Sequence, residues 1–228
     1  MNQTDKQKKI AAEKAVEQIE SGMIVGLGTG STALFAIKRI AELLESGKLN
    51  NIVGIPTSLA TEDEALKAGI RVGLLDEFPE IDITIDGADE VDGNLYLIKG
   101  GGGALLKEKI IAQASERVII VVDESKLSNQ LGEKWALPVE VVQMALEVEK
   151  RFLKTIGGSP MVRERRGGYF VTDEGNYIID ASFGVIKDPE NLASKLHERA
   201  GIVEHGLFLN IASQVIVAGK SGIKILDH

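Results

Sequence analysis

Residues 81–112, IDITIDGADEVDGNLYLIKGGGGALLKEKIIA, decide the fold. Ile81, Ile83 and Ile85 alternate with polar residues, which predicts a β-strand over residues 81–85 that is broken by Gly87. A glycine run follows Lys99 and leads into good helix formers, so a helix is expected over residues 103–114. A strand followed by a glycine turn and a helix is the repeating unit of α/β proteins.

The same alternation continues through the first 122 residues. We expect helices over residues 5–20, 33–44, 58–68 and 103–114, and strands over residues 23–27, 52–55, 71–75, 81–85 and 118–122. The strand at 118–122 is apolar on both faces, as in parallel sheets covered by helices on both sides.

The pattern changes near Gly132. Strands are expected over 139–142, 161–165, 169–171, 177–180 and 202–207, with helices over 144–156 and 189–199. Two helices on an antiparallel sheet fit a small ferredoxin-like α+β domain. The apolar segment 214–218 is expected to return to the large sheet. The predicted domains are therefore residues 1–131 with 208–228, and residues 132–207.

Composition and charge limit the kinds of partner that the protein can have. The chain has 228 residues, no cysteine, a net charge of −8 and a pI of about 5.1. The acidic balance argues against a nucleic-acid partner, while a small phosphorylated substrate remains compatible with it. No segment has the length of apolar sequence that a membrane span needs, and residues 1–20 lack the apolar core of a signal peptide. We therefore expect a cytoplasmic protein without a membrane partner.

The number and spacing of the histidines argue against a metal centre. His197, His205 and His228 all come late in the sequence, and none has a ligand-like partner three or four residues away. Without cysteine, no thiolate site is possible. We therefore predict no metal site.

The segment 86–108 carries the strongest candidates for catalysis. Asp86 and Asp89 lie at or just past the carboxyl end of a strand, where open α/β sheets place ligands. Glycines 100–103 expose backbone N–H groups before a helix, which suits an anion. Glu108 shares an apolar helical arc with Leu105 and Ile111, and desolvation there favours a general base. Each feature also has a purely structural explanation. Asp86 and Asp89 could be turn or cap residues, the glycines could form a loose loop, and Glu108 could lie on a solvated face. Each of these explanations leaves the other features unexplained.

Other loops could bind a phosphate. Residues 26–31, GLGTGS, fit neither the dinucleotide fingerprint nor the P-loop. The stretch is instead a glycine turn before a helix, and its backbone N–H groups and hydroxyls suit a phosphate. Alternatively, it is an ordinary Ser/Thr cap of that helix. Lys126 follows another strand and could neutralise a phosphate or be a solvated lysine. Thr57 and Ser58 could add hydroxyls or cap a helix. Residues 163–166, RERR, are expected in a solvated hairpin.

Five motifs together resemble the ribose-5-phosphate isomerase type A family. They are residues 28–32 (GTGST), 86–90 (DGADE), 99–102 (KGGG) with Glu108, 123–126 (DESK) and 137–140 (LPVE). Their order and spacing match over nearly the whole chain. The resemblance implies a Rossmann-like domain with a small ferredoxin-like domain, a sugar-phosphate substrate, no cofactor and a homodimer. The fourth glycine, Gly103, departs from the family's usual small residue and is expected only to loosen the helix start.

The resemblance also implies roles for individual residues. Glu108 matches the base, Asp86 and Asp89 match carboxylates that bind hydroxyls and assist ring opening, and Lys99 matches a lysine beside the reacting oxygens. The implied substrate-binding positions are Thr29, Gly30, Ser31, Thr32, Asp86, Gly87, Ala88, Asp89, Lys99, Gly100, Gly101, Gly102 and Lys126. These groups suit aldose–ketose isomerisation through an enediolate without a metal.

Two other functions were weighed. A sugar-phosphate sensor would need a DNA-binding module, for which the first 22 residues are too short. Another enzyme on this scaffold, a coenzyme A transferase or a sugar-phosphate deaminase, is the second alternative. The deaminase would need a histidine near its carboxylates, and none precedes His197.

Overall fold

The chain forms two compact units in the computed structural model, which describes residues 2–227. Unit 1 comprises residues 2–88, 107–125 and 210–227, and unit 2 comprises residues 89–106 and 126–209. The expected domains met at residues 131/132 and 207/208, whereas residues 89–106, 126–131 and 208–209 group with unit 2. The reason is strand pairing, because β5 (Glu90–Val91) and β6 (Leu97–Ile98) form a small sheet with β14 (Leu207–Phe208).

Unit 1 is built on a seven-stranded sheet in the order β16-β15-β7-β4-β1-β2-β3. Its strands are β1 (Ile24–Leu27), β2 (Val53–Pro56), β3 (Arg71–Val72), β4 (Ile81–Asp86), β7 (Ser115–Asp123), β15 (Gln214–Gly219) and β16 (Gly222–Asp227). All neighbours are parallel except β15 and β16. The expected parallel α/β sheet is confirmed, and the segment around 214–218 does return to it.

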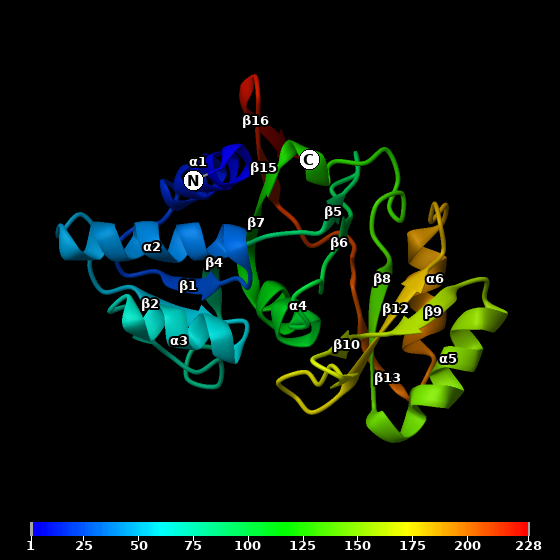
Figure 1. The fold of residues 1–228 in the computed structure, drawn as a ribbon. Helices are drawn as coiled ribbons and strands as arrows, with labels where there is room; N and C mark the ends of the chain where they lie inside the picture. The colour runs from blue at the N-terminus through cyan, green and yellow to red at the C-terminus, as the bar shows by residue number, and fades with distance from the viewer. Residues whose placement is uncertain (1, 228) are drawn as a thin grey trace. The chain divides into compact units, whose positions relative to one another are not determined.

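Helices cover both faces of this sheet (Figure 1). α1 (Gln3–Val16) and α2 (Ser31–Glu45) pack together over a core that includes Ile40, Ile83 and Ile119. α4 (Leu105–Gln113) inserts Ile111 against Ile55 on the other face. α3 (Leu59–Lys67) follows β2 and packs against it. This explains why the strands of the sheet are apolar on both sides.

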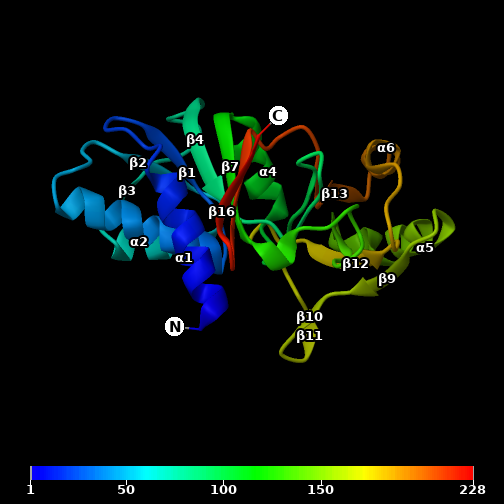
Figure 2. The ribbon, with the colours of Figure 1, turned by 90° about the horizontal axis from the view of Figure 1, so that it is seen from above.

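Unit 2 contains an antiparallel sheet in the order β13-β8-β12-β9. The strands are β8 (Leu137–Val141), β9 (Ser159–Val162), β12 (Tyr177–Ser182) and β13 (Ile202–His205). α5 (Leu146–Thr155) and α6 (Pro189–His197) contribute Leu153 and Leu196 to its core. A hairpin of β10 (Glu164–Arg165) and β11 (Gly168–Tyr169) projects from this sheet (Figure 2). The smaller α+β domain is thus confirmed.

The sequence analysis missed the short strands and misplaced some element ends. β5 and β6 have two residues each, too few to show a period, and β16 carries exposed isoleucines. α1 ends at Val16 rather than at residue 20, and α4 begins at Leu105 because Gly103 has a φ of +86°. No helix within residues 2–227 has both the length and the apolar character that crossing a lipid bilayer requires.

Candidate active site

The carboxyl ends of the parallel strands of unit 1 gather polar residues at one edge of the sheet. Leu27, Pro56 and Asp86 end β1, β2 and β4, and Leu27 lies beside both Pro56 and Ile85 in the register. The strand order reverses between β1 and β4, since their successors continue on opposite sides. Open α/β sheets bind ligands at such a switch point.

Asp86 is tied to the loop that follows β1. Its side chain is 2% exposed, and its Oδ1 accepts the N–H groups of Thr29 at 3.1 Å and Gly87 at 2.7 Å. A Cβ on Gly28 would lie 2.2 Å from that Oδ1 and 2.6 Å from the Cα of Asp86. Only glycine therefore lets the first loop approach this carboxylate.

The loop 28–32 ends in a helix start without a side-chain cap. Gly30 occupies the N-cap position with a φ of +103°, and α2 begins at Ser31. The alternative of an ordinary Ser/Thr cap is therefore wrong, and the first N–H groups of α2 suit an anion. Thr29 Oγ1 lies within 3.1 Å of the hydroxyls of Thr57, Ser58 and Thr61. Ser58 caps α3, as one alternative expected.

Lys8 was missed by the sequence analysis. Its Nζ, on α1, lies 2.9 Å from Ser31 Oγ, so a cation stands beside the uncapped start of α2. The two residues are 23 positions apart, and the sequence indicated only that Lys8 lies in the helix expected over residues 5–20. Only the packing of α1 on α2 brings them together.

Glu108 lies on α4 with its side chain 5% exposed. Leu105 and Ile111 on the same helix are also buried, as the apolar arc predicted. The alternative of a solvated Glu108 is therefore wrong. Burial removes most of the water around this carboxylate and fixes its position, and both suit a general base.

In unit 2, Lys99 and Asp89 are held around the glycine run. Lys99 is buried, its N–H donates to Gly206 O at 2.9 Å, and its Nζ lies 5.5 Å from the centre of the Phe208 ring. Asp89 Oδ2 accepts the Gly101 N–H at 2.7 Å. A Cβ on Gly101 would lie 2.6 Å from the Asp89 carboxylate. The close approach therefore requires glycine at position 101.

Arg163 corrects the expectation of a solvated hairpin at 163–166. Its Nη1 donates to the carbonyls of Gly100 at 2.8 Å and Gly101 at 3.2 Å, while its Nε donates to Asp180 at 2.9 Å. The neighbouring Glu164 and Arg165 are exposed as expected. Arg163, which directly follows β9, therefore braces the glycine run, and Asp180 on β12 holds its guanidinium in place.

Gly103 is also more constrained than the sequence indicated. Its φ is +86°, and a Cβ there would lie 2.4 Å from the ring of Phe170. The aromatic ring occupies the space that a small side chain would need. Glycine at this position is therefore required by the packing, rather than merely tolerated at a helix start.

Lys126 ends a short 3₁₀ helix, Glu124–Lys126, in which Asp123 accepts the Ser125 N–H at 3.0 Å. Its Nζ lies 4.9 Å from the centre of the Trp135 ring. Stacking on an aromatic face orients a cation without neutralising it. The solvated-lysine alternative is weakened, because Lys126 is only partly exposed.

Two further motif residues are structural. Glu90 is fully buried and accepts the N–H groups of Gly132, Lys134 and Trp135 at 2.9, 3.1 and 3.2 Å. Glu140 is fully buried on β8 and accepts hydrogen bonds from Thr172 and Asn176, both at 2.9 Å. Burial raises the pKa of Glu140 above its ordinary value.

A parallel sheet with a buried carboxylate and an uncapped helix start at its switch point is typical of the class of α/β enzymes that act on small anionic substrates. The family model of ribose 5-phosphate isomerase A (phosphoriboisomerase A) matches residues 53–222. The chain belongs to the ribose 5-phosphate isomerase A family. It is an isomerase that interconverts ribose 5-phosphate and ribulose 5-phosphate.

Individual relatives agree over the full length of the chain. A ribose-5-phosphate isomerase A of Desulfatibacillum aliphaticivorans is 56% identical over 225 residues, which cover 98% of each chain. A solved D-ribose-5-phosphate isomerase in complex with phospho-erythronic acid is 41% identical, with a TM-score of 0.97 and full coverage of both chains. The ribose 5-phosphate isomerase from Plasmodium falciparum is 43% identical, with a TM-score of 0.95, covering 98% of this chain and 99% of the other.

Proposed function

We propose that Glu108 is the base in this isomerisation and carries a proton between the two carbons of an enediolate. The observation that carries the proposal is its burial on α4, directly after the glycine run. A general base must be positioned and its carboxylate partly desolvated, and this position meets both conditions. The complex of the structural relative with phospho-erythronic acid supports a sugar-phosphate site of this kind.

The remaining groups divide the other tasks. Asp86 and Asp89 bind sugar hydroxyls and assist ring opening, since each carboxylate is fixed by backbone N–H groups. Lys99 and glycine N–H groups stabilise the charge that develops on the reacting oxygens. The backbone of residues 87, 88 and 100–102 contributes close contacts. These roles require neither a metal nor a cofactor, and the proposed mechanism therefore uses neither.

The phosphate is proposed to bind at the start of α2, with Lys8 and Lys126 as cations. Lys8 stands 2.9 Å from Ser31 Oγ, and the first turn of α2 has free capacity for an anion. Replacing Lys8 or Lys126 by alanine is expected to raise KM for ribose 5-phosphate by about tenfold or more, with a smaller effect on kcat. The reason is that the phosphate contact is the same in the ground and transition states.

Steady-state kinetics at fixed ionic strength measure this effect, and Lys6→Ala is the matched control, because Lys6 is exposed on the same helix. Unchanged KM values for both variants would place the phosphate elsewhere.

Arg163 is proposed as a positioning residue for the glycine run. Arg163→Met keeps the length of the side chain but removes the donors to Gly100 and Gly101, each of which is a charge-assisted hydrogen bond. We expect kcat to fall by about 10–100-fold, equivalent to the loss of about 1.5–3 kcal/mol.

Arg165→Met in the exposed part of the hairpin is the control for this change. Arg163→Lys is expected to recover part of kcat, because one donor can still reach a carbonyl. A kcat equal to that of the parent in Arg163→Met would show that the brace has no part in catalysis.

A homodimer and a cytoplasmic location complete the proposal. A self-associating surface is supported by Ile223 and Ile225, which stand exposed on the outer strand β16. Light scattering at micromolar concentration measures the mass directly. The location is supported by the substrate, since a phosphorylated sugar carries a charge that keeps it inside the compartment where it is made.

A further inference from the structure

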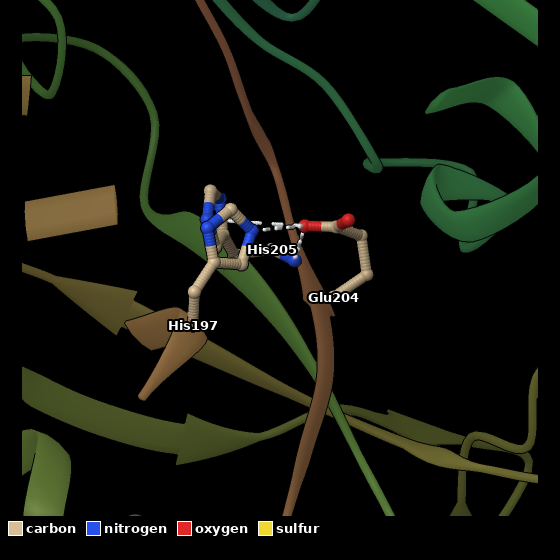
Figure 3. Close-up of side chains that lie close together, drawn as sticks. All are labelled: His197, Glu204 and His205. Carbon is tan, nitrogen blue, oxygen red and sulfur yellow. Dashed lines mark hydrogen bonds and ion pairs between the residues drawn. The ribbon is translucent and has the colours of Figure 1, made fainter. Parts of the chain in front are cut away.

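His197, Glu204 and His205 lie together in unit 2 (Figure 3). One carboxylate oxygen, Glu204 Oε1, lies 3.4 Å from His197 Nε2 and 3.8 Å from His205 Nε2. The two imidazole rings are 4.5 Å apart between centres. The three potential ligand atoms all lie within 4.8 Å of one another.

The fold explains why these residues meet although their spacing in the sequence gave no signal. His197 is the last residue of α6, and Glu204 and His205 end β13. Neighbouring residues of a strand normally point to opposite faces. The pairing of β13 with β8 shifts register between Ile202 and Glu204, and such an irregularity re-aims side chains. Glu204 Oε1 also accepts the His205 N–H at 2.8 Å, which folds the carboxylate back toward the ring.

We propose that these three residues bind one divalent transition-metal ion of the Zn²⁺ type. Two imidazoles and one carboxylate are a known donor set for zinc. Bonds of 2.0–2.2 Å in a tetrahedron separate neighbouring ligand atoms by about 3.3 Å. The two separations from Glu204 Oε1, 3.4 and 3.8 Å, approach this value, and the two imidazole nitrogens lie within 4.8 Å of each other, so side-chain movements that bring the three atoms closer complete three corners. Magnesium and calcium prefer oxygen ligands and are not expected.

The surroundings favour a cation and leave a path for it. His197 stands at the carboxyl end of α6, where the helix dipole attracts positive charge. Its side chain is 58% exposed, whereas that of His205 is 1% exposed, so the site is anchored inside and open outside. Leu207 N–H lies 3.3 Å from His205 Nδ1, and coordination through Nε2 moves the ring proton to Nδ1. That contact must open, so binding is weaker than in a closed zinc site and declines as pH falls and protons compete for the imidazoles.

Cobalt absorption tests the site directly, because tetrahedral Co²⁺ has a visible ligand-field spectrum and replaces zinc in such donor sets. Tag-free protein is titrated with Co²⁺ and then with Zn²⁺ as competitor. We expect saturation at one ion per chain and loss of the signal in His197→Ala and Glu204→Gln. His228→Ala, which removes the remaining histidine of the chain, should bind as the parent does. His205 is buried, so its replacement would test folding as much as binding and is not used.

Absence of saturable binding in the parent, or an unchanged spectrum in His197→Ala, would overturn the proposal. Isomerase activity in EDTA is a separate readout, because the catalytic roles proposed above use none of these three residues. We expect EDTA to abolish the cobalt signal and to leave turnover unchanged. Turnover that is lost by the parent in EDTA, and by His197→Ala already without EDTA, would contradict a site separate from catalysis. An equal loss in both would instead overturn the metal-free mechanism.

Discussion

Replacing Glu108 by glutamine is expected to lower kcat by about 10²–10⁴-fold, the range that a general base contributes. Glutamine keeps the shape and the hydrogen-bonding length of the side chain but has no basic oxygen that can accept and return the proton. Because Glu108 is 5% exposed on a regular helix, the substitution leaves the packing of α4 in place. The KM for ribose 5-phosphate should change little, since the proton is transferred only in the transition state.

The measurement is the rate of ribulose 5-phosphate formation, together with exchange of the substrate C2 hydrogen with solvent deuterium. Both should fall by the same factor if Glu108 carries the proton. Glu116→Gln is the matched control, because Glu116 is an exposed glutamate that follows soon after α4. Turnover within a few-fold of the parent in Glu108→Gln would remove Glu108 from the mechanism.

The arrangement of unit 1 could be predicted from local sequence. Isoleucines 81, 83 and 85 alternate with polar residues, and the strand they form ends at Asp86, one residue beyond the predicted end. Strands of this kind, separated by helices, allow only a few topologies, and the parallel sheet is one of them. The two-residue strands β5 and β6 could not be predicted, because pairing with β14, more than 100 residues later, creates them.

The candidate site likewise contains residues that local sequence indicates and residues that only the packing of distant segments brings together. Asp86, Asp89 and Glu108 could be proposed from the sequence, because a carboxylate beside glycine or on an apolar arc is visible within a few residues. Lys8 and Arg163 were not found, since each acts on a partner that is distant in the sequence: Ser31 for Lys8, and the carbonyl of Gly100 for Arg163. The His197, Glu204 and His205 cluster was missed for the same reason, as it depends on a register shift in β13. Sequence spacing detects chemistry within one element, whereas packing between elements decides the rest.

Glu90 shows that a residue in a family motif can serve the fold, and its replacement is expected to have the largest effect on stability. Its buried carboxylate accepts three backbone N–H groups, from Gly132, Lys134 and Trp135. In Glu90→Ala these three donors lose a fully buried acceptor that a methyl group cannot replace, although water can partly reach the residues that carry them. We expect the free energy of unfolding to fall by about 3–5 kcal/mol, because each donor that loses its partner costs about 1–3 kcal/mol, and less where water replaces the acceptor.

Trp135 makes this prediction directly measurable, since it is the only tryptophan of the chain and donates to Glu90. Urea unfolding followed by its fluorescence reports on the loop itself. Glu90→Gln, which keeps one acceptor oxygen, should lose less stability than Glu90→Ala, and the exposed Glu80→Ala should lose almost none. Below the unfolding transition, Glu90→Ala should keep a kcat close to that of the parent, because Glu90 acts on the backbone and not on the substrate. An unfolding midpoint equal to that of the parent would show that the three N–H groups find other acceptors. A large loss of kcat in a fully folded Glu90→Ala would instead assign Glu90 to the chemistry.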